Sequence, residues 1–189
     1  LKNTIEPEFD DVDFKYTPKS MYLPISDEGT VCLSYSCYAQ HWLGDGAPTG
    51  LPEGALYANQ LPRTCKERKR WEEASKRDWE RFLTHRAREF MPSGMLVLHI
   101  QSSMNGGSLS EVGAATLQKA KAKMISSGEI SKALAKTMVI PEYAKAPDEI
   151  LSLLLKIFDL LRPLLLELLG FLCVRVEVIL CLLERSLEF

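Results

Sequence analysis

The sequence lacks the cysteine patterns that mark disulfide-rich proteins and metal sites. Its five cysteines are odd in number and scattered, without a CxxC pair or a Cys/His ligand spacing. They are Cys32, Cys37, Cys65, Cys173 and Cys181. This pattern favours free thiols in a reducing compartment, and it predicts a cytoplasmic location and no bound metal.

Excess charge of one sign and long apolar runs are also missing. The net charge is −2 over 189 residues, so no broad nucleic-acid surface is expected. The basic run KERKR alternates with acidic residues nearby and is interpreted as a solvated helix face. Charges interrupt the leucine-rich stretch from 151 to 183, whose longest uncharged run falls short of the ~18–20 residues that a membrane span needs.

The beginning of the chain has no visible signal peptide. Its first segment, LKNTIEPEFDDVDFKY, is polar and acidic, with neither a basic nor an apolar region, and is expected to be irregular or one damaged strand. Because the chain starts at Leu1 rather than at a methionine, we expect a piece of a longer gene product. A hydrophobic content of 46% fits one globular domain with a real core.

The middle of the chain predicts an α/β fold. The β-branched and aromatic stretch TVCLSYS, residues 30–36, predicts a buried strand, and GDGAPTGLPEG, residues 44–54, predicts a loop. Apolar residues at helical spacing predict a helix over 63–90. A tight turn at MPSGM and a second apolar strand, MLVLHI, should follow, and a helix–turn–strand unit of this kind suits a doubly wound sheet.

The second half predicts two further helices and a tail. Helices are expected over about 110–126 and 131–137, within a helical cap at about 105–145, and MVIPEYAKAPDEI should be extended. We divide the chain into a domain, 1–150, and a leucine-rich tail, 151–189. The tail predicts a helix, a kink at Pro163 and the strand VRVEVIL, which completes the sheet. A membrane-surface or partner-binding role and a mispredicted gene end remain alternatives.

Four segments, in order, resemble blocks of the SABATH family of carboxyl methyltransferases. Residues 19–43, KSMYLPISDEGTVCLSYSCYAQHWL, look like the family's "SFY…P…S…SSYSLHWL". RDWERFLTHRAREFMPSGMLVL is similar to "DF..FL..R..EL.PGG.MVL", and MISSGEI is similar to "MVSEGLI". MVIPEYAKAPDEI is similar to "FNIPxYxPSxEEV". The resemblance covers about residues 17–150.

This resemblance implies a fold and a function. The fold is a partial doubly wound class I methyltransferase sheet with a helical cap, lacking the N-terminal cofactor-binding strands. Neither GDGAPTG nor NGGS opens a helix after a strand, so nothing supplies the family's glycine-rich turn. The implied function is methyl transfer from S-adenosylmethionine to the carboxylate of a small apolar acid, incomplete in this chain. The alternative is a non-catalytic remnant or interaction module, and exposed sheet edges predict self-association or a homodimer.

The chemistry of this transfer needs few special residues. A carboxylate is already ionised at neutral pH, so no general base is required, and we name no catalytic residue. Catalysis is then mainly positioning and exclusion of water. The absence of a Ser/His/Asp signature is compatible with such a site.

The resemblance also implies substrate-binding residues. Trp42 matches the tryptophan whose indole N–H holds the substrate carboxylate, and His41 and Tyr38 match pocket residues beside it. Tyr143, in IPEY, matches a pocket residue on the family's cap. The alternatives are a core tryptophan at Trp42 and a histidine at position 41 that bonds to nearby backbone.

Cofactor contacts are implied at four positions. Ser20 and Met21 match a serine–aromatic pair that contacts the adenosine, with methionine in place of the aromatic residue. Ser36 and Cys37 fall where the family has Ser-Ser near the cofactor. A catalytic role for Cys37 is not expected, because the sequence shows no helix N-terminus or cationic neighbour beside it.

Overall fold

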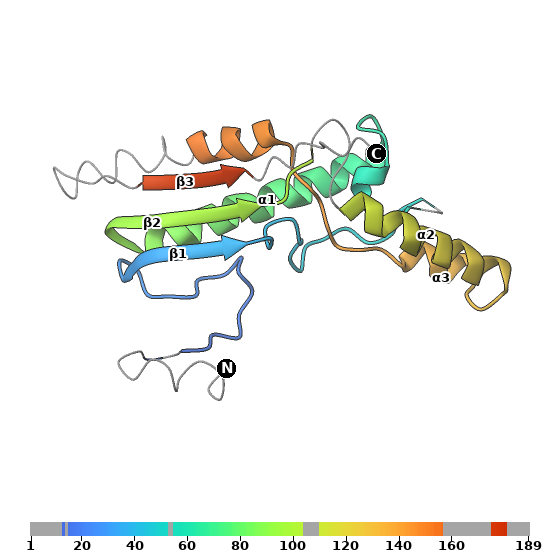
Figure 1. The fold of residues 1–189 in the computed structure, drawn as a ribbon, viewed down its shortest axis with the longest axis horizontal. Helices are drawn as coiled ribbons and strands as arrows, with labels where there is room; N and C mark the ends of the chain where they lie inside the picture. The colour runs from blue at the N-terminus through green and yellow to red at the C-terminus, as the bar shows by residue number, and fades with distance from the viewer. Residues whose placement is uncertain (1–12, 14, 53–54, 104–109, 157–174, 181–189) are drawn as a thin grey trace, which may run out of the picture.

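A small parallel sheet lies at the centre of the protein. The computed structural model describes residues 13, 15–52, 55–103, 110–156 and 175–180. Strands β1 (Val31–Cys37), β2 (Phe90–Ile100) and β3 (Arg175–Leu180) pair in the order β1-β2-β3, and both pairings are parallel. With its helices, the chain is a mixed α/β protein, as predicted (Figure 1).

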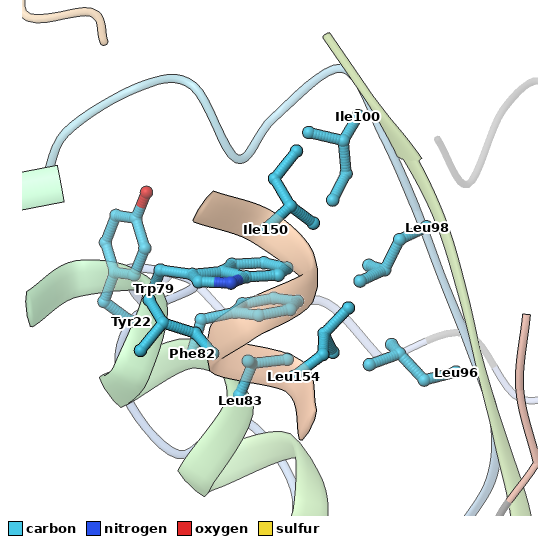
Figure 2. Close-up of a cluster of buried hydrophobic side chains, with 10 residues drawn as sticks. Tyr22, Trp79, Phe82, Leu83, Leu96, Leu98, Ile100, Ile150 and Leu154 are labelled. Atoms are coloured by element: carbon cyan, nitrogen blue, oxygen red, sulfur yellow. The ribbon is translucent and has the colours of Figure 1, made fainter. Parts of the chain in front are cut away.

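Helix α1 (Lys66–Glu89) connects β1 to β2 and contributes its largest side chains to the core. It confirms the helix predicted over 63–90 from the spacing of apolar residues. The rings of Trp79 and Phe82 are stacked with centroids 5.5 Å apart, and both side chains are almost fully buried. Figure 2 shows both rings in one cluster with Ile150, Leu154 and the leucines of β2.

Alternation along β2 decides which face of the sheet is covered. Leu96, Leu98 and Ile100 are at most 3% exposed and pack against α1 and the helical residues 147–156 (Figure 2). The intervening residues point to the opposite face. On that face Leu33 and Tyr35 of β1 are 56% and 63% exposed, so the described helices that pack on the sheet cover one face only.

The turn predicted at MPSGM is present, but it lies within β2 rather than before it. Strand β2 begins at Phe90, directly after α1, and the turn residues lie inside the strand as an irregularity in its register with β1. Ser93 has a φ of 68°, and a Cβ on Gly94 would lie 2.8 Å from the carbonyl oxygen of Val31. Glycine at position 94 therefore lets the backbone of β2 lie close to the backbone of β1.

The predicted cap helices are present. Helix α2 (Ser110–Ser126) and helix α3 (Lys132–Thr137) lie beyond the carboxyl ends of the strands (Figure 1). The hydroxyl of Ser131 caps α3 by accepting the Leu134 N–H. The buried ammonium of Lys121 donates to the carbonyls of Ala55 and Met138, which fixes α2 to the loop before α1.

The described parts of the tail agree with the prediction. Residues 147–156 are helical, with Pro147 at the first position and the Glu149 carboxylate accepting the Ala146 N–H at 2.6 Å. Strand β3 confirms the strand in VRVEVIL. The kink at Pro163 and most of the first segment lie outside the described residues, and the division at residue 150 stays a prediction. No helix in the described ranges is long and apolar enough to cross a membrane.

Candidate functional site

The carboxyl end of β1 continues into a segment that is fixed from two sides. Residues 41–43 run antiparallel to residues 141–143, with Trp42 opposite Glu142. Two backbone bonds of 2.8 Å hold them, Leu43 N–H to Pro141 O and Tyr143 N–H to His41 O. The structure therefore brings together the HWL and IPEY blocks, which lie about a hundred residues apart in the sequence. Ligands of parallel α/β sheets bind outside the carboxyl ends of the strands, where this segment lies.

Trp42 combines a fixed backbone with an exposed side chain. Its carbonyl oxygen accepts a hydrogen bond from the hydroxyl of Tyr22, which adds a third anchor. Its side chain is nevertheless 44% exposed, whereas Trp71 and Trp79 are buried. The alternative of a core tryptophan at this position does not fit such exposure. A large aromatic side chain held at the surface is available to a ligand.

His41 lies beside Trp42 in a buried environment. It is 6% exposed, its ring centroid is 5.3 Å from that of Trp42, and its Nδ1 atom has no hydrogen-bond partner among the described residues. Burial, and then the charge of Lys145, lower the pKa of His41 to about 4. The imidazole is therefore neutral at pH 7 and adds no charge of its own to the site.

The depressed pKa of His41 predicts a loss of stability in acid. The unfolded chain takes up this proton near pH 6.5 and the folded chain near 4, so the contribution is complete above 6.5 and is lost as pH falls through this window. His41→Gln removes the titrating group. Between pH 7 and about 4.5, the unfolding free energy of this variant should fall by about 2–3 kcal/mol less than that of the parent, measured by urea denaturation. If the unfolding free energies of the variant and the parent fell equally over this pH range, the prediction would be wrong.

Tyr38 sits at the bend where β1 ends. Its φ of 50° is in the left-handed region, which is costly for a tyrosine and is found where the surrounding structure enforces it. Its N–H donates to the His99 carbonyl, its ring lies 5.5 Å from the His99 ring, and its side chain is 43% exposed. Tyr38 and Trp42 are thus both exposed aromatic residues after β1.

Tyr143 is placed differently from Trp42. Its side chain is 3% exposed and lines a cavity of about 350 Å³ together with Lys145 and Glu149, and Trp42 is not part of the lining. Its hydroxyl lies 3.5 Å from Glu149, and its pKa is raised to about 12, first by burial and then by nearby carboxylates. The two blocks meet through their backbones, while these two side chains occupy different surroundings.

Sequence reasoning missed Lys145. Its side chain is almost fully buried, Nζ donates to the Gln40 carbonyl at 2.7 Å, and burial lowers its pKa to about 8. Lys145 therefore ties the IPEY block to the backbone just before His41. The only local signal is a lysine between two alanines in an otherwise apolar stretch, which is weak.

The four residues predicted to contact the cofactor do not form one cradle in the described structure. Ser36 pairs with Leu98 on the covered face of the sheet and accepts from the Gln40 amide, whereas Cys37 points to the open face. Met21 packs against the core, and the hydroxyl of Ser20 accepts the N–H of Tyr22. These four residues do not by themselves enclose a ligand in the described structure, and their contacts with S-adenosylmethionine stay a prediction.

Comparison with known proteins decides the family. The family model described as SAM dependent carboxyl methyltransferase matches residues 7–157, most of the chain. The chain belongs to this family. Its members depend on S-adenosylmethionine and methylate small carboxylic acids. This confirms the resemblance found in the four sequence blocks.

A solved structure supports the fold of the chain. The chain is similar to "Loganic acid methyltransferase with SAH", with a TM-score of 0.63 and 21% identity over 75% of this chain. The chain spans 43% of the length of that protein. None of the curated proteins compared with the chain matches it.

Proposed function

We propose that this chain binds the carboxylate of a small apolar acid at the carboxyl end of β1, so that the acid can be methylated from S-adenosylmethionine. The observation that supports this proposal is Trp42, whose carbonyl accepts from Tyr22 and whose two neighbours bond to residues 141–143, while its indole remains exposed. An indole N–H is a donor without an acceptor, so it suits an anion.

The surroundings of Trp42 fit a substrate that is already ionised. The acid needs no base, because carboxyl groups titrate near ~4. His41 is neutral at pH 7 and cannot compete as a cation for the carboxylate. Tyr38 offers an aromatic wall for an apolar substituent. The task of these residues is to hold the acid in one orientation and to exclude water around it.

The sheet is proposed to be part of a doubly wound class I methyltransferase sheet. The sequence contains no glycine-rich turn between a strand and a helix, and one face of β1 is open in the described structure. These two observations also favour the alternative of an interaction module without catalysis. Binding of an acid at Trp42 distinguishes the alternatives, because an interaction module has no need of it.

Cofactor affinity is the first quantity to measure. We expect the chain to bind S-adenosylmethionine weakly or not at all, because its sequence has no glycine-rich turn between a strand and a helix, whose backbone would approach the cofactor. Isothermal titration calorimetry on the purified chain tests this, with a complete member of the family as positive control. A dissociation constant in the low micromolar range, about 8 kcal/mol of binding, would contradict it.

Acid binding can be measured without the cofactor. In the ¹⁵N-labelled chain the indole N–H signals of the three tryptophans can be followed separately. Titration with small apolar acids, loganic acid among them, should shift the Trp42 signal. The signals of buried Trp71 and Trp79 should stay in place. The corresponding methyl esters are the control, since they lack the charged oxygen. Equal shifts with acid and ester, or no shift, would refute a carboxylate site.

A further inference from the structure

The open face of the sheet carries a thiol next to an imidazole. Cys37, the last residue of β1, is the register partner of His99 on β2, and paired residues of a parallel sheet point to the same side. The Cys37 Sγ atom lies 3.6 Å from Nδ1 of His99. Cys37 is exposed, so both groups can be reached from solvent.

A third group completes the cluster. Tyr35 lies two residues before Cys37 on the same face of β1, and a hydrogen bond between its hydroxyl and Cys37 is the main cause that raises the pKa of Tyr35. The ring of Tyr38 packs on the other side of His99, at 5.5 Å between centroids. The sulfur therefore has two neighbours that can donate a proton, and neither is a carboxylate.

We propose that Cys37 is a reactive thiol, a site of covalent modification by small electrophiles such as hydroperoxides, with His99 and Tyr35 as its positioning residues. The imidazole takes the thiol proton, and the thiolate attacks one oxygen of the peroxide. The S–O bond forms as the O–O bond breaks, the sulfur is oxidised to a sulfenic acid, and the leaving oxygen takes a proton from His99 or Tyr35. The peroxide is reduced to water or an alcohol, so atoms and electrons balance.

Two other cysteines of the chain serve as internal controls for the reactivity of Cys37. Cys32 is also exposed on β1, but it lies about 16 Å from Cys37 along the strand, at roughly 3.3 Å per residue, and is therefore far from His99. The thiol of Cys65 donates to the carboxylate of Glu67 at 2.9 Å. Cys65 is also less exposed than the other two cysteines, so reactivity should fall in the order Cys37, Cys32, Cys65.

The experiment compares these thiols within one molecule. The full chain is treated with limiting iodoacetamide at pH 7, and separately with hydrogen peroxide followed by dimedone, and each cysteine peptide is quantified by mass spectrometry. Cys37 should be alkylated about tenfold faster than Cys32 and should carry most of the dimedone adduct.

Variants test the assignment to the cluster. His99→Gln should lower the Cys37 rate to that of Cys32, and Tyr35→Phe should lower it partly, while the Cys32 rate stays unchanged as a check on folding. Equal rates for Cys37 and Cys32 in the parent chain would overturn the proposal whatever the variants do. An unchanged Cys37 rate in a folded His99→Gln chain would overturn it as well. The proposal does not depend on acid binding at Trp42.

Discussion

Replacing Glu89 by alanine is expected to lower the free energy of unfolding by about 3–5 kcal/mol. Glu89 and Arg86 form an ion pair of 2.7 Å near the end of α1, and both side chains are 3% exposed. The same carboxylate oxygen accepts the Ile25 N–H at 2.7 Å. Its removal leaves a buried guanidinium without its counter-charge, at a site where burial already lowers the pKa of Arg86.

The loss should spread to the segment before β1. Arg86 also donates to the carbonyl of Leu23 at 2.9 Å and to that of Met21 at 3.4 Å, so the pair fixes this segment against α1. Urea denaturation at pH 7 measures the effect. The control variant Arg86→Met/Glu89→Met removes both charges. Its loss of unfolding free energy should be clearly smaller than the sum of the losses caused by Arg86→Met and Glu89→Met alone. A cost below about 1 kcal/mol for Glu89→Ala would show that the pair is solvated in the protein.

Replacing Trp42 by phenylalanine is expected to weaken binding of the acid by about ten- to a hundredfold. Phenylalanine keeps the apolar bulk but removes the N–H, and a hydrogen bond to a charged group contributes about 1.5–3 kcal/mol. The free energy of unfolding should change little, since the Trp42 side chain is 44% exposed and its anchors are backbone groups. Acid affinity is measured by shifts in the amide spectrum, and methyl transfer from labelled S-adenosylmethionine is measured at millimolar cofactor.

A matched control separates binding from folding. Trp71→Phe changes a tryptophan that is 1% exposed in the packing of α1, so it should lower the melting temperature and leave the acid affinity of the folded protein unchanged. Trp42→Phe should do the reverse. If Trp42→Phe binds the acid as tightly as the parent, Trp42 does not hold the carboxylate. The same conclusion follows if the weaker binding is fully explained by a smaller fraction of folded protein.

Sequence and structure agree best where the signal is local. The helical spacing of apolar residues predicted α1 to within a few residues, and the apolar run MLVLHI predicted a strand, which β2 contains. The turn at MPSGM was predicted from its proline and glycine, but its place inside β2 was not. Here Gly94 serves a close approach of two backbones, which only the pairing with β1 reveals.

The site residues were found by pattern, but their surroundings were not. The HWL block indicated Trp42 and His41, and nothing in it shows that one side chain is exposed and the other buried. For Cys37 the sequence showed no neighbour that could stabilise a thiolate. The structure places His99 beside it, from 62 residues further along the chain.

The sequence by itself determined the family and the principal elements, since these depend on short blocks and on periodicities of two or 3.6 residues that each segment contains. Only the tertiary structure decided which side chains meet. The register of β1 against β2 joins Cys37 to His99 and sends Ser36 to the other face. The return of the IPEY block brings Lys145 to Gln40, 105 residues away. Such contacts depend on strand register and on packing over a crossover helix, which no local stretch of sequence specifies.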